Sequence, residues 1–412
     1  MRKFKFIVSS IAAVLVLSAC SGAGKGSQPV EPSGSEVPPE PVLPVGELPE
    51  GGVALDLSSA AGKQTVYNEV MAFIDAYTAP ETPFTGFGLK SQTQNVNADA
   101  TLKIDEIDEE TGKSVSYIDG EAHIENFGAT IEAKIAGDDE SWGAEASVDI
   151  NGKIAAKANV LIDEEKNKRL KLDEQLAFDH VGAQAWLTGT NVYVDASGDG
   201  LRQLLEDAKP IVAKVLPYIA DVPAGTTLDL NAIFDAMGGE DRHFYIPLDE
   251  DIEKVNPIAL VNYLQLEEDD KPSKEEIEEV LEYLAQIPFL TVQTYEDGRF
   301  GIAVDVDMEQ FIEFAETMDL DLDEDVFDMI PEAHLKVAIV IRPNGWLDSI
   351  SIAAEATVDY VEEHKDERVE LKGHAYLEEI ITASYNDEVT VTIPSADELA
   401  EYQLFDPEVL GS

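Results

Sequence analysis

Cysteine, histidine and basic side chains are scarce in this sequence of 412 residues. A single cysteine excludes an intramolecular disulfide and a cysteine-based zinc site, and six scattered histidines leave little for a histidine-built metal centre. Lysine and arginine number 28 against 83 aspartates and glutamates, and the formal net charge of −55 argues against nucleic acid as a partner. Because 44% of the residues are apolar, we expect this acidity on the surface of a folded protein.

Motifs of catalysis are also missing. The sequence contains no Gly-x-Ser-x-Gly elbow, no His-Glu-x-x-His pattern and no glycine-rich phosphate loop. Paired carboxylates carry no information in a chain with 83 of them. We therefore expect a protein that is not an enzyme and that requires no cofactor.

The first 19 residues have the pattern of a secretory signal. Arg2, Lys3 and Lys5 precede an apolar run that is too short for a permanent membrane helix. The segment Leu17-Ser-Ala-Cys20 then resembles the lipobox of bacterial lipoproteins. This resemblance implies that the Cys20 thiol receives a diacylglycerol and that cleavage makes Cys20 the N-terminus. The alternative is an ordinary secreted protein with an accidental cysteine.

Composition divides the rest of the chain into a tether and a body. Residues 20–55 are rich in Gly, Ser, Pro and Glu and have few large apolar side chains, which is typical of a flexible segment. The pattern of a globular body covers residues 56–405. Within it, a strand ending in aspartate precedes an amphipathic helix twice, at Asp195 and at Asp307. This repeated order of elements is compatible with two similar halves, 56–255 and 256–405, or with one continuous sheet.

Alternation of apolar and polar residues predicts many antiparallel strands in the body, with one face wet and the other covered by helices. Turn dipeptides separate the strands, and Ser273 with Glu276 predicts a capping box at the start of the clearest helix. The predicted turns are Thr111-Gly112, Asn151-Gly152, Asp297-Gly298 and Asn344-Gly345. The predicted strands are 100–105, 115–124, 129–135, 144–150, 154–162, 170–178, 289–295, 300–306, 335–341, 347–360, 369–384 and 389–393. The predicted helices are 64–77, 201–216 with an interruption at Pro210, 228–237, 258–266, 273–286 and 308–318.

This order of elements resembles the LolA-like and LppX-like carriers. The resemblance rests on the lipobox, the tether, a first helix, antiparallel strands, inserted helices and a last segment ending in Ile393-Pro-Ser-Ala396. It implies an α+β fold in which a large curved antiparallel sheet, like half a barrel, has helices on its concave face. It also implies an outward-facing protein, anchored to the bacterial cell membrane at Cys20, that binds a lipid or other hydrophobic ligand between sheet and helices. The rival hypothesis is a surface interaction or structural lipoprotein with a filled core; the protein partner is not indicated.

One loop has the offsets of an EF-hand calcium site. The oxygen ligands at positions 1, 3, 5 and 12 would be Asp195, Ser197, Asp199 and Glu206. Gly200 stands at position 6, but Arg202 occupies position 8, where an apolar residue is usual, and the loop follows a strand. The alternative is a turn in which Ser197 or Asp199 caps the following helix. The aspartates of residues 319–325 form a second acidic run without the required offsets.

Overall fold

The computed structural model describes residues 45–78, 84–108, 111–112, 114–138, 141–163, 168–219, 229–248, 256–258, 272–318, 329–364 and 367–405. The signal segment with Cys20, most of the helix predicted over residues 258–266, and the aspartates of residues 319–325 lie outside these ranges.

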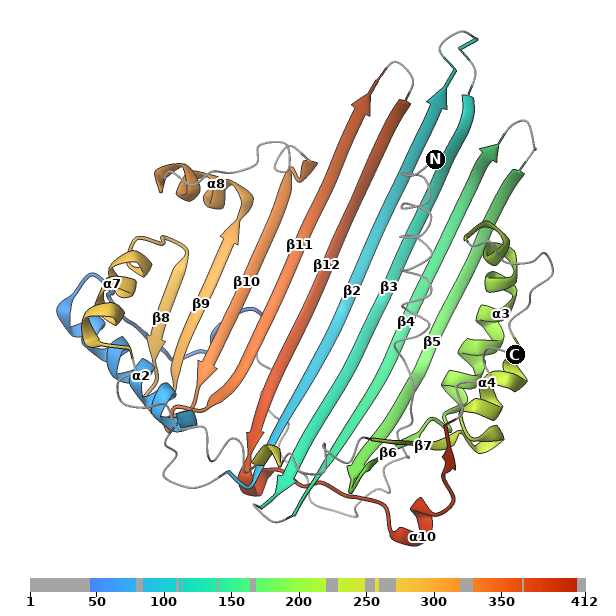
Figure 1. The fold of residues 1–412 in the computed structure, drawn as a ribbon. Coiled ribbons are helices and arrows are strands. Elements are labelled where there is room, and N and C mark those ends of the chain that lie inside the picture. Colours follow the sequence, from blue (N-terminus) through green and yellow to red (C-terminus); the bar gives the residue numbers. More distant parts are fainter. Residues whose placement is uncertain are drawn as a thin grey trace.

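The described strands form one sheet of 13 strands in the order β1-β8-β9-β10-β11-β12-β2-β3-β4-β5-β6-β7-β13 (Figure 1). Every ladder is antiparallel except the short pairing of β13 with β7. Because β12 pairs with β2 along most of its length, the two halves of the chain share one continuous sheet. The strands are β1 (Val53–Ala54), β2 (Gly86–Ile107), β3 (Ser114–Gly137), β4 (Trp142–Asp163), β5 (Lys168–Thr188), β6 (Asn191–Asp195), β7 (His243–Pro247), β8 (Leu290–Thr294), β9 (Phe300–Asp307), β10 (Glu332–Ile341), β11 (Leu347–Glu363), β12 (Glu367–Tyr385) and β13 (Gln403–Leu404).

Alternation along these strands gives the sheet one apolar face and one charged face. Successive side chains of a strand point to opposite faces, so the pairing register shows which residues share a face. Successive cross-strand partners form a row of nine residues, one from each of nine adjacent strands, on the apolar face. We call it the transverse row, and only one of its residues is polar. Its members are Val292, Ile302, Ile339, Ile350, Ile381, Ser91, Ile131, Val148 and Ala183.

Helices cover the two ends of this apolar face, which is the concave face of the curved sheet (Figure 1). At one end, Val66 and Leu281 from α2 and α7 pack on Val292 and Phe300. At the other end, α3 packs its apolar stripe on β4 and β5. The predicted fold class is therefore confirmed, with the central strands β11, β12, β2 and β3 lying between the two helix groups. The helices are α2 (Ala60–Thr78), α3 (Asp199–Ile219), α4 (Leu230–Ala236), α7 (Lys274–Leu284), α8 (Met308–Thr317) and α10 (Ala396–Leu399).

Several local predictions are confirmed. Ser273 and Glu276 form the capping box of α7, and Asp307 caps α8 with Gln310 as its partner. Asp297-Gly298 and Asn344-Gly345 connect β8 to β9 and β10 to β11, where both glycines have positive φ. Such positions suit glycine because it has no Cβ.

Three local predictions are wrong. Asn151-Gly152 makes no hairpin, because β4 runs through it and stays paired with β3 and β5 on both sides. Residues 389–393 form no strand; the Thr392 amide donates to a side chain, Glu145, and joins no ladder. Helix α3 continues through Pro210 without interruption, and Leu204 and Ala208, which precede the proline, are buried against the sheet.

A line of β-bulges crosses the middle of the sheet. Four neighbouring ladders shift register at similar levels, and the bulged strands carry Asn95, Asn126 and His180 in the left-handed region. A bulge bends its strand and increases the local twist. Because the bulges are aligned across β12 to β5, we infer that they bend the long strands together and produce the curvature of the sheet.

Substitution of Gly152, which lies in this line of bulges, tests its contribution to stability. Its φ is +140°, and a Cβ placed there would lie 2.6 Å from the Phe127 Cα on the adjacent strand. We expect Gly152→Ala to lower the free energy of unfolding by about 2 kcal/mol or more, from backbone strain and the clash together. Urea denaturation measures the change. The matched control is Gly120→Ala in β3, where the nearest atom would be 3.6 Å away; an equal loss in both variants would contradict the prediction.

Candidate functional site

The concave face carries exposed aliphatic side chains on the central strands β2 and β3 and on β10, next to β11. Leu89 on β2 is 37% exposed, Ile131 on β3 is 52% exposed and Leu335 on β10 is 41% exposed. Leu89 and Ile131 are near neighbours, since Ile131 pairs with Ser91, two residues from Leu89. A contiguous apolar surface of this kind marks a binding site more often than an isolated exposed leucine does. The face between the helix groups is therefore the candidate functional site.

An aromatic cluster closes one end of this face. Phe87 and Tyr385 are cross-strand partners with ring centroids 5.5 Å apart, and Trp346 lies 4.5 Å from Tyr385. Phe84 stacks on Trp346 at 5.3 Å, and the Trp346 indole donates to the Ala76 carbonyl of α2 at 3.2 Å. These contacts fix the aromatic end to the first helix and fill the space there.

Few polar groups interrupt the apolar surface. Beside the line of bulges, the Ser91 hydroxyl donates to Glu379 at 2.8 Å, and both residues occupy concave positions. At the end opposite the aromatic cluster, Glu106 accepts a hydrogen bond from Ser116, and Tyr360 donates to Glu362 at 2.6 Å. A ligand on this face therefore meets aliphatic side chains with a small number of hydrogen-bond acceptors.

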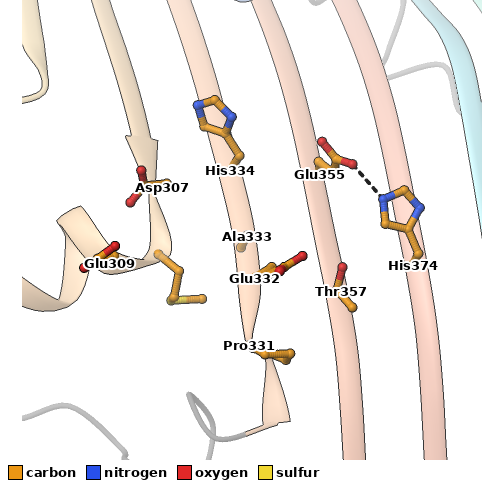
Figure 2. A pocket seen from close by; sticks show the side chains of 10 residues that line it. Asp307, Glu309, Pro331, Glu332, Ala333, His334, Glu355, Thr357 and His374 are labelled. Atoms are coloured by element: carbon orange, nitrogen blue, oxygen red, sulfur yellow. Dashed lines mark hydrogen bonds and ion pairs between the residues drawn. The ribbon is translucent and has the colours of Figure 1, made fainter.

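The convex face is more polar than the concave face and carries two pockets. A pocket of about 370 Å³ lies where β9, β10, β11 and β12 meet, and Figure 2 shows its acidic and histidine side chains. His374 lies 2.7 Å from Glu355, and His334 lies 2.6 Å from Asp305. An adjoining pocket of about 330 Å³ reaches Lys336 and Tyr376. The Tyr376 hydroxyl donates to Glu378, and this bond raises the pKa of Tyr376 to about 12.

These convex pockets do not suit a hydrophobic ligand, because acidic, basic and histidine side chains make up half or more of their lining residues. Among the residues that the structure describes, no three His, Cys, Asp or Glu side chains are placed to hold a metal ion. Sequence analysis missed the pockets, since their residues come from four strands that only the pairing register brings together.

The loop with EF-hand offsets joins β6 to α3. Asp195 ends β6, Asp199 begins α3, and Glu206 lies two turns further along that helix. The Asp195 carboxylate accepts from the Ser197 amide at 2.9 Å and lies 3.3 Å from the His243 imidazole. Asp195 thus shapes the turn before α3 through a bond to the backbone, whereas the alternative interpretation had Ser197 or Asp199 cap the helix itself.

Arg242 is the cation beside this loop, and sequence analysis did not single it out. Its side chain is buried, and the guanidinium donates to the carbonyls of Ala196 at 2.7 Å, Ser197, and Gly198 at 3.3 Å. Burial lowers the pKa of Arg242 and the nearby Arg202 lowers it further, while Asp199 and Asp195 oppose the shift.

Calcium binding at Asp195, Ser197, Asp199 and Glu206 stays a prediction. If the loop binds calcium, we expect calcium to raise the melting temperature and Asp195→Ala to abolish the increase, because a ligand that binds only the folded state stabilises it. A titration that leaves the melting temperature unchanged would contradict the prediction.

No family model matches the sequence, and no curated protein matches it. Among solved structures, the chain is similar to the InvG secretin-domain β-barrel of the Salmonella injectisome, with 9% identity over 83% of this chain and 72% of that one and a TM-score of 0.14. A β-barrel-like protein of unknown function from Brucella abortus has 9% identity over 74% and 100% and a TM-score of 0.11. The toluene transporter TodX of P. putida has 6% identity over 77% and 92% and a TM-score of 0.14. None of these scores establishes a shared fold.

Among the helices of the described segments, none is both long enough and apolar enough to cross a bilayer.

Proposed function

We propose that this chain is a noncatalytic, membrane-anchored extracytoplasmic lipoprotein that holds a lipid or other hydrophobic ligand against the concave face of its sheet. The observation that carries the proposal is the transverse row, whose aliphatic side chains continue across strands on which Leu89 and Ile131 are exposed. Apolar surface removed from water contributes roughly 25 cal/mol per Å² to binding, and a few polar groups orient the ligand.

The resemblance of Leu17–Cys20 to a lipobox supports the anchor. Residues 45–49, which were predicted to belong to the tether, pack on the convex face of the body, where the Gly46 amide donates to Ser351 at 3.1 Å and Glu47 pairs with Lys336 at 3.0 Å. The tether therefore joins the body on the face opposite the proposed ligand. A fully extended chain spans at most about 3.3–3.6 Å per residue, so the segment from Cys20 to Val45 can reach on the order of 80 Å.

The charge of the protein also supports a body that is held at the membrane by a tether. Membrane surfaces that carry anionic lipids repel an acidic protein, and the full sequence has a formal net charge of −55. This repulsion acts within about 8–10 Å at physiological salt. Two acyl chains hold a protein stably on a bilayer. We infer that the lipid keeps the protein at the membrane while the tether lets the acidic body stand away from its surface.

Native mass spectrometry of the full-length protein in detergent tests the proposal. A discrete noncovalent mass that extracts as lipid, beyond the covalent anchor, would support ligand binding. Protein at the mass of the lipidated chain alone, with no uptake of added lipid, would contradict it and favour the rival hypothesis, a surface interaction module.

A further inference from the structure

Basic side chains avoid the concave face. Every lysine and arginine of the central strands β11, β12, β2 and β3 and of the adjacent β4 occupies a convex position, as the pairing register shows. These residues are Lys90, Lys103, Lys134, Lys153, Lys157, Arg368 and Lys372. Each concave position between the helix groups is therefore aliphatic, small, aromatic, polar or acidic.

Carboxylates are the charged groups on the same face. Glu379 lies within the apolar surface, beside Ser91. Glu106 and Glu367 are cross-strand partners at the end away from the aromatic cluster. Two cations that border the face are paired: Arg342 binds Asp348 and Glu388 at the aromatic end, and Lys214 of α3 binds Glu174. An anionic group placed here would meet carboxylates without a free cation among the described central strands.

We propose, resting on the function above, that the lipid on the concave face has an uncharged, hydroxyl-bearing headgroup and that anionic phospholipids are excluded. Hydroxyl groups donate hydrogen bonds to carboxylates, whereas a phosphate at the same place is repelled. The repulsion is strong because the surrounding aliphatic side chains keep the local dielectric constant low. The affinity for lipid thus comes from contacts of the acyl chains with the transverse row. The selectivity among headgroups comes from the negative charge of the carboxylates on the concave face.

A competition within one mass spectrum tests this selectivity. The full-length protein in detergent is mixed with equal amounts of dioleoyl diglucosylglycerol and dioleoyl phosphatidylglycerol, which share their acyl chains and differ in headgroup charge. We expect adducts of the uncharged lipid to exceed those of the anionic lipid by about tenfold or more.

Reversal of one charge gives the decisive variant. Glu379→Lys places a cation within the apolar surface and should lower the ratio of uncharged to anionic adducts by about tenfold. Glu379→Gln removes the charge with little change in shape and should lower the ratio by a smaller factor, so it serves if the lysine variant fails to fold. The matched control is Glu332→Lys, an exposed residue on the convex side of β10, which should leave the ratio unchanged.

The outcomes separate the two proposals. If neither lipid binds the wild-type protein, lipid binding itself is wrong. If both lipids bind equally, or if Glu379→Lys and Glu379→Gln leave the ratio as in the wild type, lipid binding stands and the headgroup inference is overturned.

Discussion

Replacement of both Leu89 and Ile131 by glutamine is expected to weaken lipid binding by roughly 30-fold. Full burial of one leucine or isoleucine contributes about 1.5–3 kcal/mol, and the two side chains are 37% and 52% exposed before a ligand arrives. Covering that exposed part contributes about 1 kcal/mol at each position, and about 2 kcal/mol together corresponds to a factor of roughly 30 in the dissociation constant. Lipid titration followed by native mass spectrometry measures the change.

The matched control uses the next residues on the opposite face. Lys90→Gln together with Thr130→Gln puts the same side chains on the convex surface of the same two strands and should leave lipid binding as in the wild type. Because Leu89 and Ile131 are substantially exposed, the glutamine variant should keep its free energy of unfolding within about 1 kcal/mol. Equal lipid binding by both double variants would show that the concave face does not hold the ligand.

Arg242→Met is expected to lower the free energy of unfolding by about 3–5 kcal/mol. The variant removes a buried guanidinium that donates to three consecutive carbonyls and stacks over the Phe234 ring at 5.6 Å. Methionine fills part of the volume but donates no hydrogen bond, so the carbonyls of residues 196–198 lose the guanidinium as a donor. Hydrogen bonds from a charged group contribute about 1.5–3 kcal/mol each, and loss of a buried charged partner carries a penalty of about this total size.

Arg202→Met is the control for this prediction. Arg202 also lies over Phe234, at 5.8 Å, but its side chain is exposed, and only its backbone amide, not its guanidinium, bonds a loop carbonyl. We expect the control to change the free energy of unfolding by less than about 1 kcal/mol. Urea denaturation of both variants measures the difference, and similar losses would mean that the cation–π contact, not the carbonyl bonds, stabilises the turn.

The β6–α3 loop shows why a motif of offsets is weak by itself. Asp195, Ser197, Asp199 and Glu206 have the spacing of a calcium loop, yet Arg242 reaches three of the loop carbonyls from 44 to 46 residues further along the chain. The spacing of residues describes only one segment of the chain. The cation that interacts with the oxygens of that segment can come from a distant part of the sequence that the fold places beside it. The same holds for Glu379 in the candidate functional site, because its hydrogen-bond partner Ser91 is 288 residues away in the sequence.

Local chemistry alone predicted most of the helices and strands of this protein. Alternation predicts strands because side chains on opposite faces of a strand meet different surroundings, and a capping box such as Ser273 with Glu276 satisfies backbone amides within four residues. Tertiary structure decided whether a turn signal is used: Asn151-Gly152 is drawn into a 22-residue strand because β3 and β5 pair with β4 on both sides of it. It also decided the candidate site. Ile131 shares the transverse row with Ile350 and Ile381 only because β12 pairs with β2, and that register is set by contacts between residues nearly 300 positions apart.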